Sequence, residues 1–165
     1  MFTIDYLLIF KNAPPELAVF LVAMLPIAEL RGAIPVGIVG FDLPIWLVYV
    51  ISVIGNLIPA FFLLLYLDPV ARWLRRRSKV FDNFFNWLFN RTRNRFSARA
   101  EKYGVFIALV TFVAIPLPVT GAWTGSVAAY LFGVPFKRAI AAVTIGVLIA
   151  GLIVTVTTVG LSALF

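Results

Sequence analysis

Two charged side chains, Glu29 and Arg31, lie in a stretch of the sequence that carries no other charge from Leu17 to Phe41. A bare charge at the centre of a bilayer costs at least about 2.5 to 3.5 kcal/mol, so this pair needs a partner or a wet cavity. The planar guanidinium of Arg31 suits a phosphate or carboxylate group. We therefore predict that Arg31 binds an anionic substrate and that Glu29 gains and loses the coupling proton.

An ion pair that only holds this segment together is the structural alternative. On a regular helix, residues two apart point to different faces and pair poorly. Gly32 and the nearby prolines would let Glu29 and Arg31 converge, or let each find a different partner. We include Gly32 in the predicted substrate site.

A second polar group lies about ninety residues later, at Thr120, Gly121, Trp123 and Thr124. It has no charge, but it offers two hydroxyl groups and an indole N–H, and glycine permits a close backbone approach. A half-helix beginning near Gly121 would direct free N–H groups and a positive dipole end at a ligand, which favours an anion. The alternative is that these residues only satisfy the backbone of a broken helix.

Asn56 is the remaining polar side chain that we assign to the substrate site, because it lies near the centre of an apolar stretch. Lining a cavity is one role for it. Hydrogen bonding between helices is the other.

The chain has no cysteine and no histidine, so disulfides, thiolate metal sites and histidine catalysis are excluded. Proton coupling would have to use a carboxylate. No P-loop, dinucleotide-binding glycine pattern or zinc spacing is present. We therefore expect neither an enzyme, nor a cofactor, nor a metal site.

The amino-acid composition indicates the class of protein in which these candidate site residues are held. Hydrophobic residues make up 62% of the 165 positions and charged residues 13%, far from a soluble domain. The uncharged stretches Pro44–Leu67 and Ala139–Phe165 each exceed the roughly 20 residues that cross a bilayer as a helix. The sequence predicts an all-α integral membrane protein.

The polar groups lie where two other apolar stretches, 15–41 and 103–133, break at Pro26 and Pro116. Prolines and glycines recur at matching places in both halves. We predict two repeats, 15–67 and 103–165, each a re-entrant or broken helical hairpin followed by a transmembrane helix. If each hairpin enters and leaves the membrane on one face, each repeat crosses the membrane an odd number of times, and the second repeat has the opposite orientation to the first. If 15–41 and 103–133 instead cross the whole membrane as kinked helices, the two repeats have the same orientation.

The segment between the repeats, 68–102, is basic. Its part 72–102 holds ten Lys or Arg against Asp82 and Glu101, a local net charge of +8. With its recurring aromatic residues it is typical of an interfacial amphipathic helix that contacts membrane lipids. The positive-inside rule places 72–102 on the cytoplasmic side of the plasma membrane, with both termini outside in the inverted arrangement. The charge does not indicate nucleic-acid binding.

Small residues Ala142, Gly146 and Ala150 recur at four-residue spacing, which permits close helix packing in lipid. Their partner is either the first transmembrane helix of the same chain or a second copy in a homo-oligomer.

The segments ELRGAIP (Glu29–Pro35) and IPLPVTGAWTG (Ile115–Gly125), the latter preceded by Tyr103-Gly104, resemble the small multidrug export family. The similarity covers about Leu17 to Thr158. That family is similar to the DedA-like membrane proteins, whose broken hairpins and proposed flipping of lipid-linked phosphates would fit inverted repeats. The arginine of the DedA pattern in the second half is not matched at 120–125.

We expect a secondary transporter or flippase for an anionic amphiphile such as a lipid-linked phosphate, with Glu29 coupling transport to protons. One alternative is proton-coupled export of a cationic drug by Glu29, for which Arg31 would be an obstacle. The other is a structural membrane scaffold without transport.

Overall fold

The computed structural model describes residues 14–77, 79, 82–83, 86–87, 90, 104–116 and 120–162. Every regular element within these residues is a helix. The N-terminal residues 1–13 and most of the basic segment predicted to form an amphipathic helix lie outside the described residues.

The first broken stretch consists of α2 (Pro15–Met24), α3 (Glu29–Pro35) and a π-helical turn η1 (Val36–Gly40). The helix α2 begins with Pro15 in its first turn and Glu16 near its positive end, both favourable there. It ends because Leu25, with ψ 134°, is extended, the conformation that a following proline imposes. The break predicted at Pro26 is confirmed.

The restart of this stretch differs from the prediction. We expected Gly32 to belong to the break and to free Glu29 and Arg31 from regular helical geometry, but α3 already begins at Glu29, so Arg31 and Gly32 are helical. A single glycine costs a helix only about 1 kcal/mol, too little to prolong the break. Pro35 does not end the helix either, because the chain continues into η1.

The second broken stretch consists of α6 (Val105–Ala114) and α7 (Ala122–Leu131). Here too the first helix ends at an extended residue before a proline, Ile115 with ψ 113° before Pro116. The second helix begins after Gly121, as predicted. Ten-residue helices rise about 15 Å, roughly half the hydrocarbon core.

Each broken stretch is followed by a turn and a long helix, α4 (Ile45–Arg77) or α8 (Phe136–Ser162). Asp42 and Gly133 make the two turns with left-handed backbone, φ 53° and 61°. The parts Ile45–Leu67 and Phe136–Ser162 are long and apolar enough to cross a membrane. The two predicted transmembrane helices are thus present as elements.

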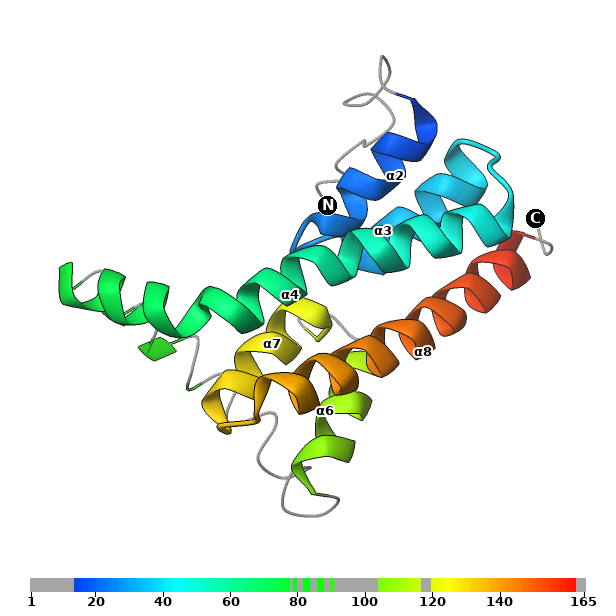
Figure 1. Ribbon diagram of the computed structural model, residues 1–165. Helices are drawn as coiled ribbons and strands as arrows, with labels where there is room; N and C mark the ends of the chain where they lie inside the picture. The colour runs from blue at the N-terminus through cyan, green and yellow to red at the C-terminus, as the bar shows by residue number, and fades with distance from the viewer. Residues whose placement is uncertain are drawn as a thin grey trace. The chain divides into compact units, whose positions relative to one another are not determined.

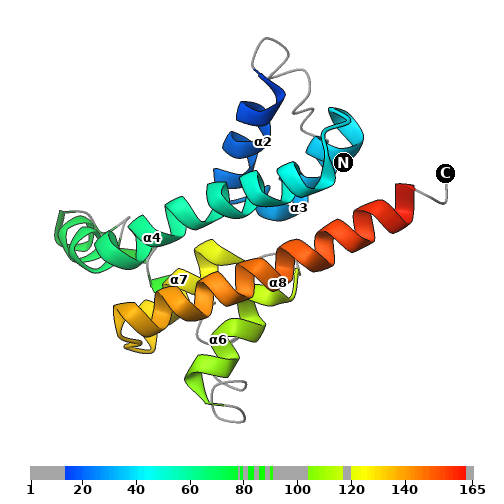
Figure 2. The same ribbon diagram turned by 45° about the vertical axis from the view of Figure 1, so that its right-hand side comes forward.

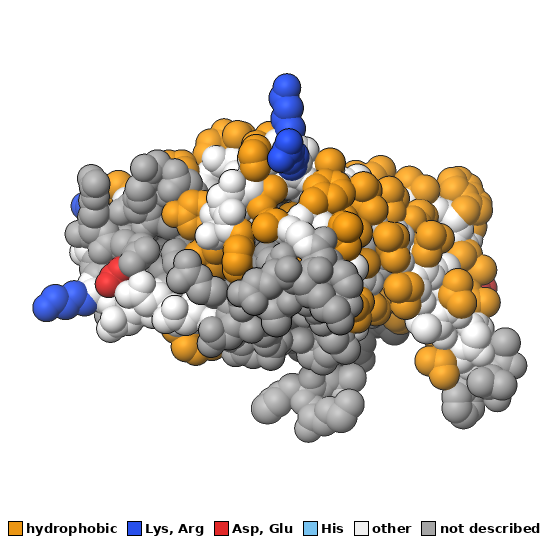
Figure 3. All heavy atoms as spheres, turned by 90° about the horizontal axis from the view of Figure 1, so that it is seen from below, with side chains coloured by type: hydrophobic (Ala, Val, Ile, Leu, Met, Phe, Trp, Pro, Cys, Tyr) orange, Lys and Arg blue, Asp and Glu red, His pale blue; other side chains and the backbone are white. Residues whose placement is uncertain are grey.

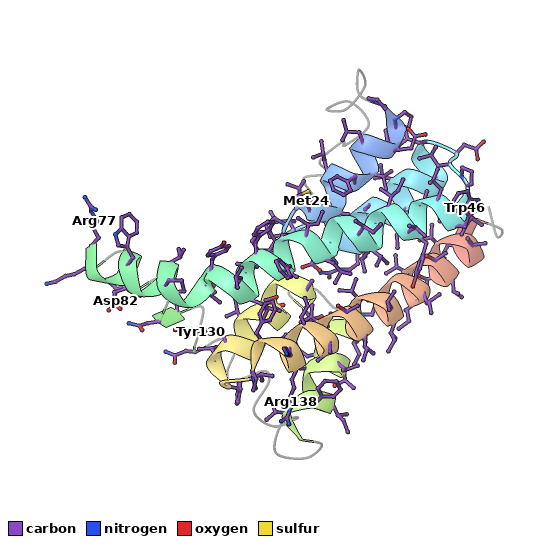
Figure 4. The ribbon with its side chains drawn as sticks, in the orientation of Figure 1. Met24, Trp46, Arg77, Asp82, Tyr130 and Arg138 are labelled. Carbon is purple, nitrogen blue, oxygen red and sulfur yellow. The ribbon has the colours of Figure 1, made fainter. Side chains whose placement is uncertain are left out.

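We expected the segment 68–102 to begin a helix separate from the transmembrane helix before it, and this boundary is wrong. The helix α4 continues without interruption through Pro69 to Arg77. A proline removes one hydrogen bond from a helix, but the neighbouring turns hold this one together. Figure 4 shows Trp46 near the start of α4 and Arg77 at its far end.

The chain divides into two compact units, one holding residues up to Ile58 together with those from Leu148 onward, the other holding Pro59–Val147. In the first unit, α2 packs on α3 and η1 and all three lie beside the first part of α4 (Figure 1). In the second unit, α6 and α7 lie beside the first part of α8 in both ribbon views (Figure 2).

Close contacts at glycines hold each unit together. A methyl group in place of the Gly55 hydrogen would lie 2.7 Å from the carbonyl oxygen of Phe20. At Gly146 it would lie 2.6 Å from Cβ of Val113 and 3.0 Å from the carbonyl oxygen of Val110. Gly146 of the predicted small-residue stripe therefore packs on α6 of the same chain, a partner that we had not considered.

The outer faces of α4 and α8 carry many exposed, large apolar side chains. On α8 these are Phe136, Ile145, Leu148, Ile149, Leu152, Ile153, Val156 and Leu161. Hydrophobic side chains are also the commonest kind over the described surface in Figure 3, where Lys and Arg project at few places. A surface of this kind is stable in lipid rather than in water, so the chain is a membrane protein.

Candidate functional site

Glu29 lies at the restart of the first broken stretch and is buried, with 5% of its surface exposed. Its backbone is left-handed, with φ 46°, a conformation that costs a non-glycine residue about 1 to 3 kcal/mol. Its N–H donates to the carbonyl oxygen of Leu25 at 3.0 Å, which closes the turn across the break. The carboxylate therefore stands at the positive end of α3, where a negative charge is stabilised.

Arg31 and Gly32 follow in the first turn of α3. Arg31 is half-buried, and the N–H of Gly32 donates to the carbonyl oxygen of Ala28 at 2.9 Å. Both Glu29 and Arg31 have interaction partners in the structure. The acid and the guanidinium thus occupy one short helix that starts inside the chain's apolar region.

Asn56 lies on α4 in the same unit and is 1% exposed. Its Oδ1 atom is buried and has no hydrogen-bond partner in the described part of the chain. The same holds for Oγ of Ser52, one turn earlier on α4. Sequence reasoning missed Ser52, although the four-residue spacing to Asn56 would have placed both on one side of a helix.

In the second unit, Thr120 spans the break between α6 and α7. It is buried, and its hydroxyl group donates to the carbonyl oxygen of Ile115 at 2.8 Å. That carbonyl belongs to the residue that ends α6, so Thr120 supplies a missing partner to the broken backbone. This contact agrees with the structural alternative that we kept open for this group.

Gly121 precedes α7 with φ 154° and ψ −165°, a region open essentially to glycine alone. Its carbonyl oxygen accepts the N–H of Gly125 at 2.8 Å and, at 3.5 Å, the hydroxyl of Thr124. Trp123 is half-buried with its indole nitrogen inside. Among the described residues no side chain caps the start of α7, and the first N–H groups of a helix have no intrahelical acceptor.

Ser126 is a second polar residue that sequence reasoning missed. It is fully buried, and its hydroxyl group donates to the carbonyl oxygen of Ala122 at 2.8 Å and lies 3.4 Å from that of Ala60. The second distance joins α7 to the second part of α4 within one unit. Nothing in the sequence around Ser126 indicated that its side chain would pack between α7 and α4.

The predicted site residues are divided between the two compact units. Glu29, Arg31, Gly32 and Asn56 belong to the first compact unit, and Thr120, Gly121, Trp123 and Thr124 to the second. Among the described residues, no three Asp or Glu side chains gather as metal ligands would.

A comparison with protein families matches residues 29–153 to the family described as putative small multi-drug export protein. Comparisons with curated proteins and with solved structures gave no match. The matched range begins at the restart of the first broken stretch and contains the second break, both polar groups and most of each long helix. On this match over most of its length, the chain belongs to the family of putative small multi-drug export proteins.

Proposed function

We propose that this protein is a secondary transporter or flippase that moves an anionic amphiphile, such as a lipid-linked phosphate, across the plasma membrane. The observation that carries the proposal is Glu29, a buried carboxylate at a strained helix restart with Arg31 in the same first turn. Short helices that begin and end inside the apolar region are typical of transporter binding sites.

Two inverted repeats would supply the framework. The contact of Gly55 with the Phe20 carbonyl oxygen has a counterpart in that of Gly146 with the Val110 carbonyl oxygen. The two glycines are 91 residues apart in the sequence, and the two residues that supply the carbonyl oxygens are 90 apart. In each half, therefore, a carbonyl at the equivalent place of the first short helix contacts the equivalent glycine of the long helix. This agreement supports a repeat, and single crossings by α4 and α8 would invert it.

The charge distribution supports one orientation. The basic segment 72–102 follows the apolar part of α4, and Lys137 and Arg138 are exposed in the first turn of α8. In the inverted arrangement all of these charges lie on the cytoplasmic side, as the positive-inside rule requires. There the segment 72–102 also contacts anionic lipid headgroups.

The binding chemistry favours an anion. In the first unit, the Arg31 guanidinium can donate two parallel hydrogen bonds to a phosphate. In the second unit, taken by itself, the start of α7 offers backbone N–H groups with a positive dipole end, which also suits an anion. Glu29 would exchange partners with the substrate. It is protonated while Arg31 holds the anion and ionised when it interacts with Arg31 again, and this exchange couples transport to protons.

Export of a cationic drug is the second candidate. The name of the family and the buried carboxylate of Glu29 favour it, because one carboxylate can exchange a proton for a cationic cargo. Arg31 would then oppose binding by like-charge repulsion.

Vesicles reconstituted with the purified protein would separate the two candidates. We expect flipping of a fluorescent polyprenyl-phosphate analogue, faster with a proton gradient, and little export of a cationic dye. The variant Arg31→Gln should lower flipping at least tenfold, while the exposed Arg138→Gln, which removes the same charge elsewhere, should leave it near wild type. Two results together would refute the proposal of an anionic substrate: no lipid flipping by the wild type, and export of the cationic dye that persists or rises in Arg31→Gln.

A further inference from the structure

Two buried polar atoms of α4 have no hydrogen-bond partner in the described part of the chain. They are Oγ of Ser52 and Oδ1 of Asn56, and their residues are 0% and 1% exposed. Buried polar atoms are nearly always hydrogen-bonded in proteins. We therefore expect a further group that supplies the missing hydrogen bonds.

The second half of the chain indicates that packing alone does not require polar side chains at these places. The two glycines of the long helices that contact the first short helix of their own half are 91 residues apart. At the same spacing Ser52 corresponds to Val143 and Asn56 to Val147, and both valines are fully buried. The polar pair of the first half therefore has a role that a buried apolar pair does not fill.

In the first compact unit, α4 has neighbours on two sides. A methyl group at Gly55 would lie 2.7 Å from the carbonyl oxygen of Phe20, so this position faces α2. Tyr49 faces α8, because its Cε2 atom would lie 2.8 Å from a methyl group at Gly151 and its hydroxyl donates to the carbonyl oxygen of Leu148 at 3.1 Å. All five residues belong to the same unit.

Ser52 and Asn56 lie between these two sides of α4. Successive residues of a helix are about 100° apart, so Ser52 is about 60° and Asn56 about 20° from Tyr49, in the direction of Gly55. Both side chains are thus on the sector of α4 between its contacts with α2 and its contacts with α8, which explains their complete burial.

The spacing of the two residues admits one small molecule between their polar atoms. Cβ atoms of residues four apart on a helix are about 5 to 6 Å apart, and a water molecule with a hydrogen bond of about 2.8 Å on each side spans that distance. Oδ1 of Asn56 only accepts, so the bridging group must carry a hydrogen. Water has two, whereas a carboxylate or a fully ionised phosphate has none. Neither side chain is charged, so the pair requires no ion.

We propose that Ser52 and Asn56 bind an ordered water molecule inside the first compact unit. The water donates one hydrogen to Oδ1 of Asn56 and accepts the hydroxyl hydrogen of Ser52. Gly55 contacts Ala23 in the last turn of α2, and the carbonyl groups of a last turn lack intrahelical donors, so an acceptor for the second hydrogen belongs to the same junction. Buried waters typically make about three hydrogen bonds. The site stands independently of the proposed function, because its test uses no transported substrate.

The test measures contact with water by solid-state NMR of the full chain in lipid bilayers, with asparagine labelled by nitrogen-15. We expect magnetisation to pass from water to the side-chain amide of Asn56, and Ser52→Ala should slow this transfer at least about twofold. Ser126→Ala is the matched control. It also removes a fully buried serine hydroxyl, but that hydroxyl donates to the carbonyl oxygen of Ala122 at 2.8 Å, so the transfer to Asn56 should not change.

A double-mutant cycle then tests whether one molecule connects the two side chains. Ser52→Ala and Asn56→Val each leave one polar atom without its bridge, so each should raise the ratio of unfolded to folded protein at least about fivefold in SDS titrations. The double variant leaves no polar atom unsatisfied, so its effect should be smaller than the product of the two single effects. Combining Asn56→Val with Ser126→Ala should give the full product.

An Asn56 amide that receives no magnetisation from water would overturn the site. Single variants that each stabilise the protein would also overturn it, because stabilisation is expected when an atom that is truly unsatisfied is removed. Coupling in the cycle without transfer from water would mean a direct hydrogen bond between the side chains, and would refute the water as well. If Asn56→Val does not fold, the transfer in the wild type and in Ser52→Ala decides alone.

Discussion

At the scale of single residues, Glu29 combines two unfavourable features. It is an ionisable group buried in an apolar region, and its φ of 46° is one that glycine would adopt more easily. Such strained positions cluster at functional sites, where the surrounding structure holds them in place. Asp42 has a similar φ of 53° but is exposed in a turn, so it offers a matched control.

We predict that Glu29→Gly raises stability and abolishes transport. Removing the backbone strain should stabilise the fold by about 1 kcal/mol, while the coupling carboxylate is lost. Asp42→Gly should give the stability gain alone. Melting temperatures and lipid flipping measured on both variants check this, and normal flipping by Glu29→Gly would show that the carboxylate has no part in transport.

At the scale of elements, two glycines set how closely each long helix approaches its own broken stretch. The neighbours of Gly55 and Gly146 include backbone carbonyl oxygens, which cannot swing aside as a flexible side chain would. By contrast, a methyl group at Gly160 on α8 would meet nothing within 4 Å. The three positions are all helical, so they share the same gain in helix propensity on substitution by alanine.

Gly55→Ala and Gly146→Ala are each expected to destabilise the protein by about 1 to 3 kcal/mol through overpacking. Gly160→Ala should leave stability unchanged or raise it slightly. Unfolding in mixed micelles with increasing SDS gives the comparison. Equal stability of all three variants would mean that the two contacts do not hold the units together, and would remove the main support for the repeat.

The elements differ in how well local sequence rules predict them. Proline predicted both breaks, because it disfavours the helical region for the residue before it, although Pro35, Pro59 and Pro69 remain inside helices. The start of α3 at Glu29, the π-helical turn η1 and the continuation of α4 through Pro69 were not predicted. At Gly32 and Pro69 a local preference that is weaker than packing was taken for a helix boundary, and no sequence signal indicated η1.

At the scale of the whole molecule, composition was sufficient to predict a helical membrane protein, and polar residues in apolar runs pointed to most of the candidate site. Ser52 and Ser126 were missed because a serine in a membrane helix is common and carries no charge signal. Their burial depends on contacts among α4, α7 and their neighbours, which no local pattern contains. The left-handed backbone at Glu29 was likewise invisible, since only tertiary structure imposes it.

The transport proposal depends on the two broken stretches entering the membrane from opposite faces, so that both breaks lie at mid-depth. Pro44 and Pro135 are exposed, equivalent residues just before α4 and α8. The chain has no native cysteine, so single-cysteine variants at these positions report one site each.

The decisive measurement is labelling of Pro44→Cys and Pro135→Cys in intact cells with a maleimide that cannot cross the membrane. The inverted arrangement predicts labelling of Pro44→Cys from outside, and of Pro135→Cys only after the membrane is opened. Labelling of both positions from the same face would mean parallel repeats with fully crossing helices, and would contradict the account.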